Sequence, residues 1–307
     1  MRFSFPEKKV IEASKPLPGK SLAFSPLAFA QVLKATEEEL GPDLDWHFTE
    51  SGERFEPIFN AFYPQLEKEG LKAITSQKVS VGTVEPVNRF LKKKGFSIKL
   101  KPLRDPQGIA CAAVVDIVTM WQTEGEKQSL TLDTSKKVVP GIKLEQVQFF
   151  TDSTKEKIIV ELETKSAIRV FVTPDNSKGF EDEFELFEQV TALTAEKEIF
   201  ERVRFKGVAF PMVDLSHDKD PTWLLKTTVT SNNGDGLFIS QAKSQHILRL
   251  NEKGARAKAA VAIALARSLP LPPFTINSPY LIWFELDGMV LFCARVDEDV
   301  MREPTSL

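Results

Sequence analysis

The sequence predicts an α+β fold in which several sheets are combined with helices that do not alternate regularly with the strands. Three observations lead to this prediction. Short β-branched and aromatic runs crowd residues 129–175, apolar residues at helical spacing occur at 55–66 and 84–94, and Asp287-Gly288 separates two apolar runs as in a hairpin. A doubly wound sheet would need strict alternation of strand and helix, which the sequence does not show.

In the N-terminal half, the spacing of apolar residues and the positions of helix-breaking residues predict the helices and strands. Residues 22–35 begin extended and turn helical at Pro26, which suits a first helical turn because its missing N–H costs nothing there. A core-facing helix is expected at 55–66 and another helix at 84–94, and the run 109–121 is typical of a strand buried on both faces.

The C-terminal half is predicted to be rich in strands. A helix is expected within 180–200, after an acidic stretch. Strands are expected in four runs within 129–175, and at 205–215, 280–284 and 289–296. Residues 222–230 are expected to form a strand or a short helix, and residues 237–250 one strand or a pair of strands.

Composition and charge exclude several functional classes. The chain has 307 residues, with 40 Lys and Arg against 43 Asp and Glu, and a net charge of −3, so it shows no overall electrostatic footprint for nucleic acid. With 23 Phe and 42% hydrophobic residues it can bury a core. No apolar run approaches the roughly 18–20 residues that span a bilayer. The charge balance and the lack of such a run together mean that neither nucleic acid nor a membrane is an expected partner.

The chemistry-bearing residues form no catalytic or metal-binding pattern. Two cysteines, Cys111 and Cys293, can form at most one bridge, and His47, His217 and His246 do not fall in a metal-ligand spacing. No nucleophile–base spacing and no phosphate-binding loop is evident. We therefore expect no enzyme, no metal and no cofactor.

Two charged features and the chain start have simple interpretations. Glu181 and Glu183 are expected to be solvated charges rather than an acid–base pair. Lys92–Lys94, with Lys99 and Lys101 nearby, are either a solvated helix end or an anion-binding patch. The opening MRFSFPEKKV has no apolar segment of a secretory signal, which with few cysteines favours an intracellular protein, unless a leader has been removed.

Residues 254–273 contain conflicting signals. Alanine content predicts a helix from Ala255 to Leu265. Alternation predicts a strand instead, with small and apolar residues on one face and both charges, Arg256 and Lys258, on the other. The following Arg267-Ser268-Leu-Pro-Leu-Pro-Pro can continue neither a helix nor a central strand, and resembles a cleavage site for a trypsin-like protease.

Several segments, in order along the chain, resemble the serpins, which inhibit serine proteases by inserting a cleaved loop as a new strand. The segments are LAFSPLAFAQVL (22–33), VNRFLKKKGFSIKL (87–100), AIRVFVTPDN (167–176), VAFPMVDL (208–215), LRLNEKGARAKAA (248–260) and SPYLIWFELDGMVLFCARV (278–296). The resemblance implies a single serpin-like domain over 1–307, with a reduced helical region at about 1–84 and a reactive loop at about 254–277.

The resemblance also implies particular site residues. The hinge is Glu252, Lys253, Gly254, Ala255, Ala257, Ala259 and Val261. The scissile bond is Arg267–Ser268, because arginine fits the acidic pocket of trypsin-like proteases, or, by the usual family spacing, Ser268–Leu269, which would suit an elastase-like enzyme. The expected partner is a trypsin-like serine protease in a covalent complex, and the chain is expected to be monomeric.

Departures from the family pattern lie where the main sheet must open. Ser25 matches a serine beneath the sheet, whereas Ala28 replaces a second one. Asp116 lies near the usual place of an asparagine, and Ser244 lies where a histidine is usual. These changes support the alternative of a non-inhibitory protein that binds a partner or is a plain protease substrate.

Overall fold

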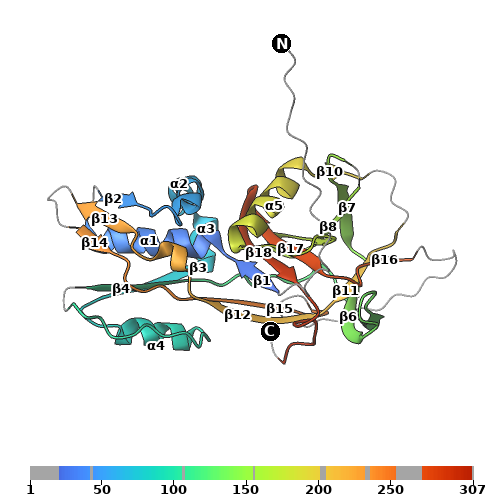
Figure 1. Ribbon diagram of the computed structural model, residues 1–307. Helices are drawn as coiled ribbons and strands as arrows, with labels where there is room; N and C mark the ends of the chain where they lie inside the picture. The colour runs from blue at the N-terminus through green and yellow to red at the C-terminus, as the bar shows by residue number, and fades with distance from the viewer. Residues whose placement is uncertain are drawn as a thin grey trace, which may run out of the picture.

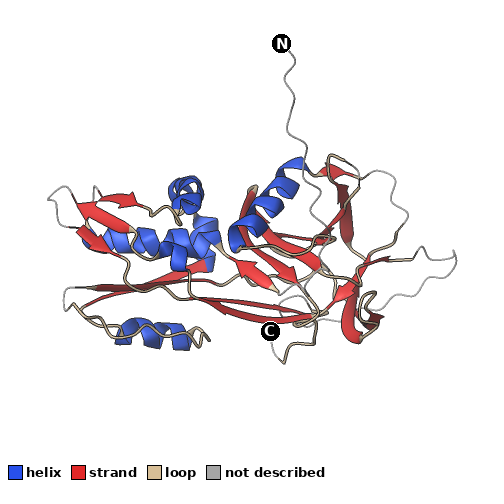
Figure 2. Ribbon diagram, in the orientation of Figure 1, coloured by secondary structure: helices blue, strands red, loops and turns tan. Residues whose placement is uncertain are grey.

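The computed structural model describes residues 21–41, 44–105, 108–154, 156–200, 205–231, 236–253 and 272–305. Strands form most of its framework, and the helices pack around them (Figure 1 and Figure 2). None of the helices in these ranges is long and apolar enough to cross a membrane.

The helices begin and end where the sequence places suitable residues. They are α1 (Pro26–Leu40), α2 (Glu56–Phe62), α3 (Glu69–Ile74), α4 (Glu85–Lys93) and α5 (Glu183–Glu196). Helix α1 ends at Gly41, whose φ of 104° is disfavoured for other residues. Helix α5 begins at Asp182, whose carboxylate accepts a 2.8 Å bond from the Glu185 amide.

Most strands belong to a large antiparallel sheet and two smaller ones. The seven-stranded sheet has the order β1 (Leu22–Phe24), β18 (Met289–Val296), β17 (Tyr280–Leu286), β9 (Arg169–Pro174), β8 (Ile158–Leu162), β7 (Val147–Thr151) and β10 (Glu198–Ile199). The four-stranded sheet has the order β16 (Phe274–Thr275), β11 (Val208–Pro211), β6 (Val138–Leu144) and β5 (Glu126–Thr131). The three-stranded sheet joins β14 (Gly236–Phe238), β13 (Thr228–Ser231) and β2 (Leu44–His47).

Two further strand pairs form a layer below α1 in Figure 1. In one, β3 (Thr75–Val81) pairs antiparallel with β4 (Ile109–Val115), and in the other, β12 (Val213–Lys219) pairs antiparallel with β15 (Ser244–Leu250). Helix α1 contacts β3 and β4 from one side, and α4 contacts the same two strands from the other. The layer is therefore built from two separate halves.

The predicted elements are mostly present, with differences in their bounds. The Asp287-Gly288 hairpin forms between β17 and β18, with φ values of 50° and 80° that suit a two-residue turn. The predicted strand at 205–215 is instead two strands in different sheets, β11 and β12, separated at Met212. The predicted strand at 109–121 ends at Val115, and its alternating burial shows that only one of its faces is fully covered.

Candidate functional site

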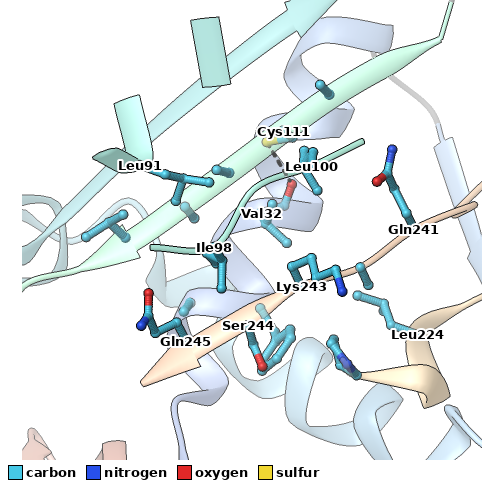
Figure 3. A pocket seen from close by; sticks show the side chains of 18 of the residues that line it. Val32, Leu91, Ile98, Leu100, Cys111, Leu224, Gln241, Lys243, Ser244 and Gln245 are labelled. Atoms are coloured by element: carbon cyan, nitrogen blue, oxygen red, sulfur yellow. Dashed lines mark hydrogen bonds between the residues drawn. The ribbon is translucent and has the colours of Figure 1, made fainter. Parts of the chain in front are cut away.

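A cavity of about 1460 Å³ separates the two halves of the divided layer. Within the described ranges, β4 pairs with β3 and β15 pairs with β12, and no ladder joins β4 to β15. The facing edges of these two strands therefore line the cavity together with side chains from α1 and from the segment that follows α4 (Figure 3). Free strand edges offer N–H and C=O groups to an added strand.

The floor of the cavity is helix α1, through Phe29, Val32 and Leu33. Cys111, on β4, points to this floor and donates a 3.5 Å hydrogen bond from Sγ to the carbonyl of Val32 (Figure 3). Burial raises the pKa of the Cys111 thiol to about 12, so the group stays protonated at neutral pH. The sulfur therefore acts as a small apolar surface rather than as a nucleophile.

The roof of the cavity is residues 96–103, which we call the strap. Its Ile98 and Leu100 line the cavity and pack against the apolar cluster of α4 and β4 that includes Val87 and Leu91. Residues 97, 99 and 101 are exposed, whereas Ile98 and Leu100 are half-buried, the alternation of an extended chain. The strap thus turns one face to the cavity and the other to solvent.

The strap is held by hydrogen bonds to three side-chain amides rather than by a strand ladder. Gln241 accepts from the Lys101 amide at 2.9 Å and donates to the Lys101 carbonyl at 2.8 Å. Gln245, on β15, accepts from the Ser97 amide at 2.7 Å. From the other side, Asn88 on α4 pairs with both backbone groups of Leu100 at 2.8 and 3.0 Å. The strap is therefore secured to both β15 and α4.

At one end of the cavity the two halves of the layer are tied together. Trp121, beyond the end of β4, donates a 2.9 Å hydrogen bond from Nε1 to the carbonyl of Asn251, beyond the end of β15. The Gly125 amide donates to the Glu252 carbonyl at 2.7 Å. Because the carboxyl ends of β4 and β15 lie at this same end, the two strands run in the same direction. We call this end the mouth.

The predicted hinge begins at the mouth. Glu252 is 6% exposed, and its carboxylate lies 3.5 Å from Nζ of Lys127. Lys253 is half-buried and its amide donates to Oδ1 of Asn251 at 2.9 Å. The remaining predicted hinge residues and both alternatives for the scissile bond lie outside the described residues: Gly254, Ala255, Ala257, Ala259, Val261, Arg267, Ser268 and Leu269.

The chain resumes beside the four-stranded sheet. The Lys206 amide donates to the Pro272 carbonyl at 3.1 Å, and β16 pairs in parallel with β11. The segment 254–271 therefore connects the mouth of the cavity to a different sheet. Its 18 residues exceed the length of β15, which has 7.

The structure brings the three predicted sheet-opening residues to the same cavity. Ser25, Asp116 and Ser244 all line it. Ser25 is buried, and its hydroxyl donates to the Leu291 carbonyl at 3.0 Å, which ties the start of α1 to β18. The Ser244 hydroxyl donates to the Lys219 carbonyl at 2.9 Å on the paired strand β12, and Asp116 is exposed.

Sequence reasoning missed a buried histidine in the cavity wall. His246, on β15, is 8% exposed and lies between Phe29 and Phe292, with ring centroids 6.3 and 6.2 Å away. Its Nδ1 has no hydrogen-bond partner in the described part of the chain. Burial and the facing His217 lower the pKa of His246 to about 4, so it is neutral at pH 7. The alternation of β15, which puts residue 246 on the face of Leu248 and Leu250, was the available signal.

The expectation that Glu183 is solvated was wrong. Glu183 is 4% exposed, and its carboxylate accepts from Lys219 and, at 2.9 Å, from Trp223 Nε1. Burial favours the neutral acid, but these bonds outweigh it and lower the pKa of Glu183. The residue is a buried anion that ties α5 to β12. The described ranges contain no group of three or more His, Cys, Asp or Glu that could hold a metal ion.

Comparison of the backbone with solved structures decides the fold. No family model matches the sequence, and no curated protein matches it. Among solved structures, Serpin48 of the insect Tenebrio molitor matches with a TM-score of 0.53 and 14% identity, over 90% of this chain and 91% of that one. The chain has the serpin fold.

Two other serpin-fold neighbours are similar over comparable lengths. Mouse protein-Z dependent protease inhibitor matches with a TM-score of 0.53 and 16% identity over 90% of each chain. Human thyroxine-binding globulin, solved as a complex with thyroxine, matches with a TM-score of 0.57 and 13% identity over 91% of this chain and 92% of that one. The serpin fold and the α+β class expected from the sequence are confirmed.

Proposed function

We propose that the chain is a serine protease inhibitor that acts as a suicide substrate, with its reactive loop at about residues 254–277. The observation that carries this proposal is the cavity between β4 and β15, whose strand edges are unpaired in the described ranges and whose mouth is where the loop begins. Serpin48 and the protein-Z dependent inhibitor, which share the fold, are described as a serpin and a protease inhibitor.

The covalent step takes place on the loop. The catalytic serine of a trypsin-like protease attacks the carbonyl carbon of Arg267, and the bond to the Ser268 nitrogen breaks. The new α-amine of Ser268 takes up the proton that the serine releases through the histidine of the protease. The Arg267 acyl group remains as an ester on the protease. The trap succeeds if insertion is faster than hydrolysis of that ester.

Insertion places the freed strand between β4 and β15. A chain that turns back at residue 254 runs antiparallel to β15, and it also runs antiparallel to β4 because the two strands share a direction. Both new ladders are therefore antiparallel. The face of Ala255, Ala257, Ala259 and Val261 would lie on the α1 floor, and Arg256 and Lys258 would point to the strap side.

The strap must move before the strand can enter fully. Ile98 and Leu100 occupy the roof of the cavity, and the amides of Gln241 and Gln245 hold the strap against β15. Their hydrogen bonds contribute roughly 0.5–1.5 kcal/mol each, a modest barrier that a strand gaining two ladders can overcome.

A gel experiment tests the proposal directly. The protein is mixed with trypsin at equal concentration and separated under denaturing conditions. A covalent band of the summed mass supports the inhibitor, and Arg267→Ala should abolish it. Sequencing the released fragment distinguishes the two bonds, because it begins at Ser268 or at Leu269. Clean cleavage without a covalent band would contradict the proposal.

A matched pair of variants tests the assignment of the buried face. Ala259→Glu places a charge on the face that meets α1, and should turn the inhibitor into a substrate because the charge cannot be buried without a partner. Lys258→Glu changes a neighbouring residue on the opposite face and should leave the covalent band intact. Equal behaviour of the two variants would show that the face is assigned wrongly.

The alternative function is a non-inhibitory protein that binds a ligand or is cleaved as a plain substrate. One observation favours it: the Ser244 hydroxyl is bonded to β12 and does not reach across the cavity to β4. Thyroxine-binding globulin, with the same fold, binds thyroxine. In this case, loop cleavage would yield two fragments, no covalent band and no gain in thermal stability.

A further inference from the structure

One serine of the strap follows a pair of lysines at a spacing that no other hydroxyl residue of the chain shares. Ser97 has Lys93 and Lys94 four and three positions before it, and no other Ser or Thr in the sequence has Lys or Arg at both positions. Basophilic protein kinases select such serines, because acidic groups in their substrate groove pair with cations on the N-terminal side of the target. The sequence therefore offers a phosphorylation motif at this residue.

The Ser97 side chain is accessible in the folded protein. The residue is exposed, as are Lys93 and Lys94 at the end of α4. Its hydroxyl oxygen accepts a 3.0 Å hydrogen bond from Nε2 of Gln245, a contact that does not use the hydroxyl proton. The hydroxyl is thus held at the surface with its proton available for transfer.

The strap has the form of chain that a kinase groove accepts. Its residues alternate in exposure, as in an extended segment. Its backbone amides at Ser97, Leu100 and Lys101 bond to the side chains of Gln245, Asn88 and Gln241 rather than to a neighbouring strand. The strap can therefore detach by local opening, without breaking a β ladder.

We propose that Ser97 is a phosphorylation site for a serine/threonine kinase that prefers basic residues before its target. Oγ of Ser97 attacks the γ-phosphorus of ATP, the bond from that phosphorus to the β–γ bridging oxygen breaks, and ADP leaves. The hydroxyl proton passes to the catalytic aspartate of the kinase. The product carries a charge of about −1.5 to −2 at pH 7. This proposal is independent of the proposed function, because it concerns the strap of the intact protein.

The phosphate would have charged neighbours on different elements. Lys94 and Lys99 lie within three residues of Ser97 in the chain, so they remain near the phosphate whether the strap is docked or not. Asp218 of β12 is directly opposite Gln245 in the β12–β15 ladder, and so on the face of the side chain that holds Ser97. Because Asp218 stays with β12, its repulsion acts only on the docked strap. Phosphorylation should therefore favour release of the strap from β15.

The test uses the full chain, ATP and the catalytic subunit of cyclic-AMP-dependent protein kinase, a basophilic enzyme, with the site located by tandem mass spectrometry. We expect phosphate at Ser97 as the main product, and its loss in Ser97→Ala. Lys93→Gln/Lys94→Gln should slow the reaction about tenfold or more. The control Lys136→Gln/Lys137→Gln removes the other exposed pair of adjacent lysines in the described ranges, and should leave the rate nearly unchanged.

Freeing the strap should make Ser97 a better substrate. In Gln241→Ala/Gln245→Ala the strap loses its partners on the β15 side, so phosphorylation should be several-fold faster, because the docked strap must otherwise detach first. Absence of phosphate at Ser97 in both the native chain and this variant would overturn the proposal. A main product at another residue, or an unchanged rate in Lys93→Gln/Lys94→Gln, would overturn it as well.

Hydrogen exchange then measures the effect on the strap. The amides of Ser97, Leu100 and Lys101 should exchange about fivefold faster in the phosphorylated protein. Asp218→Asn should reduce this difference, whereas Asp133→Asn, an exposed carboxylate in the turn between β5 and β6, should not. Slower exchange after phosphorylation would contradict the release of the strap and leave the modification site itself standing.

Discussion

Trp121 donates a 2.9 Å hydrogen bond from its indole N–H to the backbone carbonyl of Asn251 at the mouth of the divided layer, beside the bond from the Gly125 amide to the Glu252 carbonyl. The two residues are 130 positions apart in the sequence, and they follow β4 and β15, the strands on either side of the cavity. Any strand that enters from residue 254 must begin beside this contact. It is therefore the point at which a local change should alter the opening of the layer.

Replacing Trp121 with Phe should ease opening of the mouth. The variant loses the hydrogen bond and leaves the Asn251 carbonyl unpaired, at a cost of about 1–2 kcal/mol. A synthetic peptide with the sequence of residues 254–266 should then bind several-fold faster. Trp223→Phe is the control, because it loses an indole hydrogen bond of the same length, to Glu183, that does not join the two halves of the layer. Equal acceleration in both variants would show that general destabilisation, not the mouth, controls opening.

Removing the strap amides should expose the cavity. In Gln241→Ala/Gln245→Ala the backbone of residues 97–101 loses its partners on the β15 side, so its amide hydrogen exchange should rise at least tenfold. Lys243→Ala changes a residue between the two glutamines and should leave this exchange unchanged. Protection that persists in the double variant would mean that Asn88 and apolar packing alone hold the strap.

Stability should fall with acid through His246. Its folded-state pKa of about 4 lies below the ordinary value of 6.5, so between these values the unfolded chain binds a proton that the folded chain does not. The contribution is present above pH 6.5 and is lost as the pH falls, by about 2 kcal/mol at pH 5. Urea unfolding at pH 7 and pH 5 measures it. His246→Phe should reduce the difference, and an unchanged difference would assign the acid sensitivity to other groups.

Cys111 should report on whether the cavity is filled. It is half-buried in the cavity wall, while Cys293 is fully buried, so slow alkylation by iodoacetamide should modify Cys111 first. After loop cleavage an inserted strand would cover the thiol, and the alkylation rate should fall at least tenfold. The variant Ala259→Glu, cleaved in the same way, should keep the rate of the intact protein. A rate that cleavage does not alter would indicate an empty cavity.

Local patterns predicted much of the fold because their causes are local. Asp287 and Gly288 adopt the positive φ values that the hairpin requires, and Pro26 begins a helix where its missing N–H is harmless. The break at Met212 was missed because residues 208–213 are one continuous apolar run that includes all of β11 and the first residue of β12, which enter different sheets. Tertiary packing, not propensity, separates them.

The candidate site was predicted only in part, for a physical reason. The alternation at Ala255–Val261 is visible in the sequence, and so is the position of Ser25 before a helix. The strap could not be predicted from the sequence, because its hydrogen bonds join Lys101 to Gln241 and Ser97 to Gln245, which are 140 and 148 residues apart. The same holds for His246, whose neighbours Phe29 and Phe292 come from distant elements.

The most direct test of the account is the thermal unfolding midpoint of the protein before and after cleavage of the loop. Insertion would add a central strand with two antiparallel ladders, worth on the order of 10 kcal/mol, so the midpoint should rise by on the order of 20 °C. Ala259→Glu should show little rise after the same cleavage. A cleaved protein that unfolds at the temperature of the intact one would contradict loop insertion, and with it the proposed mechanism of inhibition.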